Sequence, residues 1–168
     1  MLNAMTNFND YEIFLHACCG NEHAATMLKQ LTDYAHVMDD LTDRDLTVSI
    51  DHAMQVMWEY AVALPANPFY REHRAQIDAL VAVAAANWKA ATHIEREFEN
   101  GLTDRLHVAY IIRSGYIDLV AYCAHVIGGP EWAAQVALKV RTINQDETPE
   151  AFKRNLEAEI AARKAGEH

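Results

Sequence analysis

The sequence predicts an all-α fold, a single-domain bundle of six to seven helices with one long central helix. Apolar residues recur every three or four positions along most of the 168 residues, as on one face of a helix. Valine and isoleucine rarely alternate with polar residues and alanine is frequent, which favours helix over strand. No linker or repeat divides the chain, and its length suits one helical domain over residues 1–168.

Two helices are expected in the first forty residues. Asp10 is placed to cap a helix over residues 11–19, and Gly20 supplies the left-handed residue that ends it. Asn21 then caps a longer helix over residues 22–38 or beyond, because apolar residues recur at helical spacing throughout this stretch.

The middle of the chain is expected to hold the long helix. Thr47 or Ser49 caps a helix that ends near Leu64, because Pro65 follows. The pair Asn67-Pro68 marks another helix start. No breaker interrupts residues 69–99, which form the long helix with a bend expected near Ala85.

Three further helices complete the bundle. Thr103 is expected to cap one that runs to about Ile127, with Asp104 in its first turn. Gly128-Gly129-Pro130 separates it from a shorter helix over residues 131–142. Thr148-Pro149 begins a last, strongly charged helix over residues 150–165, expected along the bundle edge or against a partner chain.

The net charge of −10 and the three cysteines limit the classes of function. No basic stripe is visible, so duplex nucleic acid is not an expected partner. The cysteines are odd in number and form no Cys-x-x-Cys pair, which favours reduced thiols and a cytoplasmic location. No secretory leader pattern is seen, and polar residues interrupt every apolar stretch before the ~20 residues of a membrane span, so no membrane association is expected.

An acidic cluster near the end of the second helix is the first candidate site. The positions i, i+3, i+4 and i+7 of one helical face would be occupied by His36, Asp39, Asp40 and Asp43. Carboxylate oxygens suit Mg²⁺, and carboxylates at a helix C-terminus are unfavourable unless a cation compensates. In the alternative interpretation the helix stops before the aspartates, Thr42 or Asp43 caps the next helix, and the acidic residues are solvated.

A second candidate is a charged residue within an apolar run. Asp118 stands in Tyr-Ile-Asp-Leu-Val-Ala, on an expected stripe with His107, and is expected to be at least partly buried. An unpaired buried carboxylate costs several kcal/mol, so it requires a metal, an arginine or a hydrogen-bond network. Asp118 is therefore either a metal ligand or a structural partner of Arg113 or a histidine.

The remaining candidates have simpler explanations. Glu95 and Glu99, one turn apart and followed by Asp104, form either a carboxylate pair or the solvated end of the long helix. The nine histidines are scattered without a His-x-x-x-His pair, which gives little support for zinc. Spacing typical of core residues is shared by Met54, Met57, Trp58, Trp88 and Trp132.

Two short stretches resemble known enzyme families. Asp39-Asp40-Leu-Thr-Asp43 resembles the Asp-Asp-x-x-Asp motif of class I isoprenoid synthases, all-α enzymes that hold Mg²⁺ and a diphosphate. It is also similar to the Glu-Glu-x-x-Glu pattern of the all-α nucleotide pyrophosphohydrolases, the MazG and dimeric dUTPase group, with aspartate replacing glutamate. In that group a second helix carries Glu-x-x-Asp before an apolar run. Tyr-Ile-Asp118-Leu-Val-Ala-Tyr is similar to the aspartate of that motif and the apolar run after it, with Gly115 where the glutamate would stand.

These patterns lead to two hypotheses of different class. The first is a magnesium-dependent enzyme acting on a diphosphate-bearing small molecule, similar to a nucleotide pyrophosphohydrolase. In that hypothesis the metal (Mg2+) ligands are Asp39, Asp40, Asp43 and Asp118. His36 or His107 orients a ligand or water, and Arg113 neutralises phosphate charge. The second hypothesis is a non-catalytic helical interaction or self-association module with an acidic surface, which would form a homo-oligomer.

Overall fold

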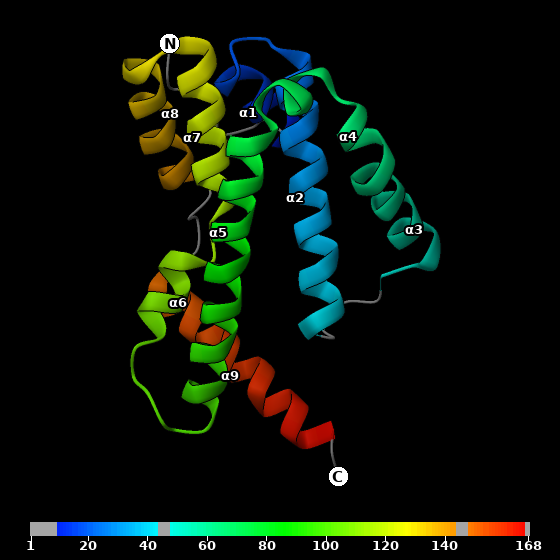
Figure 1. Cartoon of the computed structure of the whole chain (residues 1–168). Coiled ribbons are helices and arrows are strands. Elements are labelled where there is room, and N and C mark those ends of the chain that lie inside the picture. Colours follow the sequence, from blue (N-terminus) through cyan, green and yellow to red (C-terminus); the bar gives the residue numbers. More distant parts are fainter. Residues whose placement is uncertain (1–9, 44–47, 144–147, 167–168) are drawn as a thin grey trace.

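The computed structural model describes residues 10–43, 48–143 and 148–166, and every regular element in these ranges is a helix (Figure 1). The elements are α1 (Asp10–Ala17), α2 (Glu22–Asp43), α3 (Ile50–Trp58), the π-helical turn η2 (Glu59–Ala63), α4 (Leu64–Ala66), α5 (Pro68–Glu99), α6 (Leu106–Ile112), α7 (Tyr116–Gly128), α8 (Pro130–Ile143) and α9 (Pro149–Gly166). The all-α single-domain bundle is confirmed, and the predicted long helix is α5, with 32 residues.

The bundle is arranged around α5. Helix α2 lies beside α5, and α3 lies beside α2 on the side away from α5 (Figure 1). Helices α7 and α8 pair with each other and pack near the first half of α5, with α1 close to them. Helices α6 and α9 lie near the second half of α5. Each half of the long helix therefore lies near helices that come from different parts of the chain.

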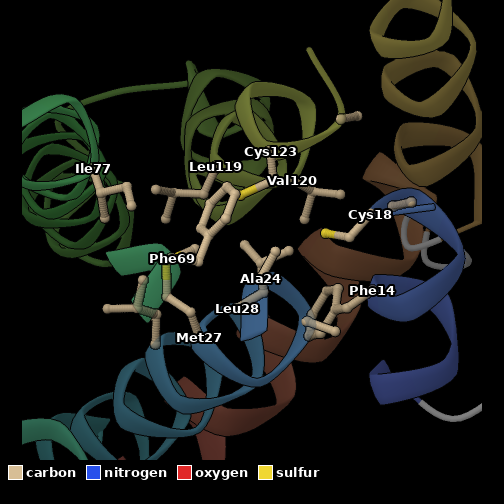
Figure 2. Close-up of a cluster of buried hydrophobic side chains, with 14 of the residues drawn as sticks. Phe14, Cys18, Ala24, Met27, Leu28, Phe69, Ile77, Leu119, Val120 and Cys123 are labelled. Carbon is tan, nitrogen blue, oxygen red and sulfur yellow. The ribbon is translucent and has the colours of Figure 1, made fainter. Parts of the chain in front are cut away.

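The main core lies where α1, α2, α5 and α7 meet (Figure 2). Its largest fully buried side chains include Phe14, Met27, Leu28, Ile77 and Val120. Burying a large apolar side chain contributes roughly 1.5–3 kcal/mol, so this cluster is the principal source of stability. Two buried thiols, Cys18 and Cys123, belong to it. A hydrogen bond of its thiol with Cys18 and burial raise the pKa of Cys123 far above its ordinary value, which keeps this thiol protonated and unreactive.

A smaller core lies at the other end of α5. Ala91 of α5, Leu106 and Ala109 of α6, and Leu156 of α9 are buried together. Phe98 of α5 packs against this cluster, and so do Phe152 and Ile160 of α9. The charged last helix therefore packs along the edge of the bundle, which is one of the two alternatives that its sequence allowed.

Local capping signals explain where several helices begin. The Asn67 side-chain oxygen accepts hydrogen bonds from the backbone N–H groups of Phe69 (2.9 Å) and Tyr70 (3.1 Å), and Pro68 occupies the first helical position. Ser49 caps α3 by accepting from the backbone of His52 at 3.2 Å. These starts agree with the sequence prediction, while Thr47 lies outside the described residues.

The single helix predicted from Thr103 to Ile127 is wrong. It is divided into α6 and α7, which are separated at Arg113, Ser114 and Gly115. A Cβ atom placed on Gly115 would lie only 2.8 Å from the Cβ of Ala84, so glycine permits this break to approach α5 closely. Tertiary packing against α5 thus overrides the local helical preference of the apolar sequence.

Two smaller expectations are also corrected. Thr103 does not cap a helix, because α6 begins only at Leu106, and its hydroxyl oxygen accepts from the backbone N–H of Arg105 at 3.1 Å. Asp104 consequently precedes the helix rather than occupying its first turn. The residue of α5 with non-helical dihedral angles is His73 (φ −111°, ψ 17°), not a residue near Ala85.

The predicted burial of the apolar residues of α3 is wrong. Trp58 is 64% exposed, Met54 is 55% exposed and Met57 is 52% exposed. Trp88 and Trp132, by contrast, are half-buried within the bundle. Helical spacing identified an apolar face on α3 correctly, but it could not tell whether the chain itself covers that face.

Candidate functional site

The acidic stretch Asp39-Asp40-Leu-Thr-Asp43 lies on a helix. Helix α2 continues through Asp43, so Asp39 and Asp40 are not cap residues of a following helix. The hydroxyl of Thr42 donates to the carbonyl oxygen of Met38 at 2.7 Å, a bond within the helix, so the predicted capping role of Thr42 is wrong. The aspartates therefore occupy the last turns of α2, where the helix dipole disfavours negative charge.

Arg113 joins this acidic end to the long helix. Its Nη2 donates to both carboxylate oxygens of Asp39, each at 3.1 Å, and its Nη1 donates to Oε1 of Glu95 at 2.7 Å. The side chains of Arg113 and Glu95 are 24% and 10% exposed, whereas that of Asp39 is 36% exposed. Arg113 thus makes ion pairs with two carboxylates from two different helices.

Trp88 supplies another hydrogen bond at the same carboxylate. Its indole N–H donates to Oδ1 of Asp39 at 2.7 Å. Asp39 therefore accepts bonds from a tryptophan of α5 and from the arginine that follows α6. These contacts hold the carboxylate in one orientation and connect α2 to α5 near the end of α2.

The sequence of α5 explains why these partners converge. Ala84, Trp88, Ala91 and Glu95 are spaced by four, three and four residues, so they lie on one face of the helix. Ala84 meets the backbone of Gly115, Ala91 is fully buried, and the two larger residues contact the charged cluster. The break between α6 and α7 then brings Arg113 against the same face. We call Asp39, Trp88, Glu95 and Arg113 the Arg113 cluster.

The charges of the Arg113 cluster do not cancel. One guanidinium faces the carboxylates of Asp39 and Glu95, which leaves one formal negative charge. Asp40, the next residue of α2, is half-buried and adds another carboxylate to this end of the helix. The cluster therefore combines a cationic group that suits phosphate with surplus negative charge that suits a metal cation.

The other predicted site residues lie in varied surroundings. His36 is exposed on α2, one turn before Asp40, and the side chain of Asp43 lies outside the described residues. His107 is exposed on α6, and the break after α6 interrupts the stripe that it was expected to share with Asp118. His36 thus remains on the acidic helix, whereas His107 belongs to a separate element.

Asp118, which was expected to be at least partly buried, has a half-exposed side chain. Its side chain is 50% exposed and accepts a 2.7 Å hydrogen bond from Nη2 of Arg141 on α8. The expected structural pair with an arginine is present, but the partner is Arg141 and not Arg113. Among the residues that the structure describes, no three histidine, cysteine, aspartate or glutamate side chains gather as a metal-binding group.

Sequence reasoning missed the roles of Glu95 and Trp88. The sequence pattern groups Glu95 only with Glu99 and Asp104, at the end of the long helix. In the structure Glu95 is buried against Arg113, while Asp104 lines an open hollow between the end of α5 and the start of α6. The sequence did contain an indication of this burial. Glu95 lies four residues after Ala91, on the same helical face, and Ala91 has the spacing of the core residues.

Three comparisons, with protein-family models, with curated proteins and with solved structures, found no significant match to this chain. Within the described ranges, no helix combines the length and the apolar character that a membrane span requires. The functional proposal therefore rests on the residues of this chain and on the geometry of the Arg113 cluster.

Proposed function

We propose that this protein is a magnesium-dependent enzyme whose substrate is a small molecule carrying a diphosphate. The observation that supports it is the contact between Arg113 and Asp39 at the acidic end of α2. A guanidinium is suited to phosphate oxygens, and a carboxylate is suited to Mg²⁺. The pair therefore offers both kinds of side chain that a magnesium diphosphate needs.

The small number of carboxylates fits magnesium. Mg²⁺ is usually held by one or two carboxylates together with waters and substrate phosphates, rather than by a cage of protein ligands. Asp39 and Asp40 supply those carboxylates, and Asp43 extends the acidic sequence by one helical turn. Such a site is completed by the substrate, so it does not require three converging protein ligands in the free enzyme.

Binding then proceeds as an exchange of partners. In the free protein Asp39 neutralises Arg113. With magnesium diphosphate bound, the Asp39 carboxylate would hold the metal and the guanidinium would contact phosphate oxygens, so one ion pair would be replaced by two charge-assisted contacts. Glu95 keeps its 2.7 Å contact with Arg113 during this exchange and holds the guanidinium in place.

The chemistry that follows is hydrolysis of a phosphoanhydride. We assign His36, exposed one turn before Asp40, to orienting the attacking water. The water oxygen forms a bond to one phosphorus atom as the anhydride P–O bond breaks, the second phosphate leaves with the bond electrons, and the proton lost by the water passes to a phosphate oxygen. Arg113 stabilises the charge that develops on the phosphate oxygens, and a magnesium ion held by Asp39 and Asp40 would supply further electrostatic stabilisation there.

The test is thermal unfolding of the full chain with magnesium chloride, with inorganic pyrophosphate, and with both together. A ligand present at about 100 times its Kd stabilises the native state by about 2.7 kcal/mol, so the pair should raise Tm by roughly 5–10 °C. Either component alone should produce a much smaller shift, because each completes only half of the site.

Two variants make this test specific. Asp40→Asn removes one carboxylate from the acidic end of α2 and should abolish the joint shift. Asp33→Asn is the matched control on the same helix and should retain the shift. Asp33 lies two turns before Asp40, and its side chain pairs with Lys29. Equal shifts in both variants, or no shift in the wild type, would reject the proposal and favour the non-catalytic interaction module.

A further inference from the structure

Exposed apolar side chains are concentrated in one segment of the chain, on the neighbouring elements α2, α3 and η2. Seven of the twelve large hydrophobic side chains that are exposed in the described residues fall between residues 38 and 62. They are Met38 and Leu41 of α2, Ile50, Met54, Met57 and Trp58 of α3, and Val62 of η2. We call these seven residues the α3 face. A concentration of this kind is unusual on a protein that functions alone.

The α3 face is not the side by which α3 joins the bundle. Val56, on the opposite side of α3 from Met54 by helical spacing, is buried. Tyr60 of η2 stacks on Tyr34 of α2 with ring centroids 4.0 Å apart. The inner side of this segment therefore already packs on α2, and the outer apolar side is additional. Figure 1 shows α3 at the edge of the bundle, beside α2 and away from α5.

The composition of the face indicates a protein partner. Methionine and tryptophan are enriched at the centres of protein interfaces, and lysine is depleted there. Residues 48–66 contain no lysine or arginine, and their acidic side chains are Asp51 and Glu59. A helix that binds an anionic membrane surface carries a basic polar face, so this segment does not suit a lipid surface.

The area of the face is sufficient for a dimer. Ile50 is 81% exposed, and the other six side chains are between 38% and 64% exposed. At roughly 150–250 Å² for each fully exposed large side chain, the face offers on the order of 700 Å². An interface of standard size buries about 800 Å² on each partner. The α3 face therefore offers most of the area that each partner of such an interface contributes.

We propose that the α3 face binds the α3 face of a second copy of this chain, with the two α3 helices antiparallel. A twofold contact uses the same patch on both partners, and the α3 face offers such a patch because its residues come from the neighbouring elements α2, α3 and η2. Parallel helices would place Asp51 beside Asp51 and Glu59 beside Glu59, which is unfavourable. With antiparallel helices centred near Val56, each acidic residue instead faces an alanine, Ala61 or Ala53.

The antiparallel arrangement also matches apolar groups. Ile50 of one copy lies against Val62 of the other, and Met54 lies against Trp58. A methionine thioether makes favourable contacts with an aromatic ring. The contact between Met54 and Trp58 is therefore more stabilising than burial of its apolar area alone. Trp58 is therefore expected to be the side chain whose loss weakens the dimer most.

The first test is sedimentation velocity of the full chain over a roughly hundredfold concentration range. We expect a monomer–dimer equilibrium in the wild type. Trp58→Glu should raise the dimer dissociation constant about 30-fold or more. Leu138→Glu is the matched control, because Leu138 is 69% exposed on α8 outside the α3 face, and it should change this constant by less than about threefold. Circular dichroism confirms that both variants remain folded.

A second test determines the orientation of the helices. In a Cys19→Ser background, Met57→Cys should form a disulfide-linked dimer under mild oxidation, because the two copies of residue 57 lie close to the twofold axis. Ile50→Cys should not, because its two copies lie about 18 Å apart along the helix axes. Equal cross-linking of both variants would indicate parallel helices and overturn the geometry. A monomeric wild type, or a dimer unaffected by Trp58→Glu, would overturn the interface itself.

The dimer is independent of the proposed enzyme function. The α3 face and the Arg113 cluster use different side chains, so loss of dimerisation leaves the magnesium diphosphate proposal open, and the reverse also holds.

Discussion

Arg113, like Asp39, links three separate parts of the chain within its cluster. It follows α6, contacts Glu95 on α5 and contacts Asp39 on α2. Its guanidinium forms ion pairs with the Glu95 carboxylate, which is 10% exposed, and with the Asp39 carboxylate, which is 36% exposed, and removing the partner of a buried charge is destabilising. Arg113 therefore stabilises the bundle whether or not it also binds phosphate, and the two roles are separable by experiment.

Replacing Arg113 with methionine should reduce the free energy of unfolding by about 2–4 kcal/mol, because Glu95 and Asp39 then lose their cationic partner. Urea denaturation at neutral pH measures this loss. Arg141→Met is the matched control. It removes the partner of the half-exposed Asp118, and an exposed ion pair contributes only about 0–1 kcal/mol. Losses of equal size would show that burial of the Arg113 cluster adds nothing to its stability.

At the level of elements, the break between α6 and α7 is the feature that creates the candidate site. An unbroken helix would have carried Arg113 in a regular helical turn. The chain instead leaves helical geometry, and the backbone of Gly115 approaches Ala84 of α5. Two small residues at this contact allow the break to sit close enough for Arg113 to contact both α5 and α2.

Gly115→Ala should lower the free energy of unfolding by about 1–3 kcal/mol, because the new Cβ atom would lie 2.8 Å from that of Ala84. The double variant Gly115→Ala/Ala84→Gly should recover part of the loss, since it removes the facing methyl group. Thermal unfolding of the two variants measures the recovery.

Gly101→Ala provides the control for this rescue. Gly101 has φ +70°, and no atom lies within 4 Å of the position that a methyl group would take there, so its substitution strains only the local backbone. Adding Ala84→Gly to Gly101→Ala should therefore restore nothing. Recovery in both pairs would mean that Ala84→Gly stabilises the protein generally. The loss of stability in Gly115→Ala would then not be explained by its close contact with Ala84.

At the level of the whole molecule, α2 lies between the two surfaces that carry the proposals. One face of α5 holds the Arg113 cluster against α2, while the α3 face lies beyond α2 at the edge of the bundle (Figure 1). This arrangement allows a dimer to form without covering α5. An enzyme of this design would bind its substrate in each subunit.

The independence of the two surfaces gives a crossed prediction. Trp58→Glu should abolish the dimer and keep the Tm shift produced by magnesium with pyrophosphate. Asp40→Asn should abolish that shift and keep the dimer. Sedimentation velocity and thermal unfolding of the same two preparations measure both properties. Loss of the shift in Trp58→Glu would show instead that the substrate site requires the second subunit.

Local sequence patterns were sufficient for the fold class and for most helix boundaries. The caps Asn67 and Ser49 and the stop at Gly20 act through bonds or backbone angles within a few residues, so their effect is visible in the sequence. The acidic face of α2 was identified for the same reason, because residues three and four apart always share a helical face.

Contacts between distant residues depended on the packed structure. The pairing of Arg113 with Glu95 and Asp39, the exposure of Asp118 and the uncovered apolar side of α3 all follow from how helices pack against one another. Helical periodicity states which residues share a face, but not which face meets which neighbour. That choice is made by the combined burial of many side chains and by close approaches such as Gly115 against Ala84, which no short stretch of sequence contains.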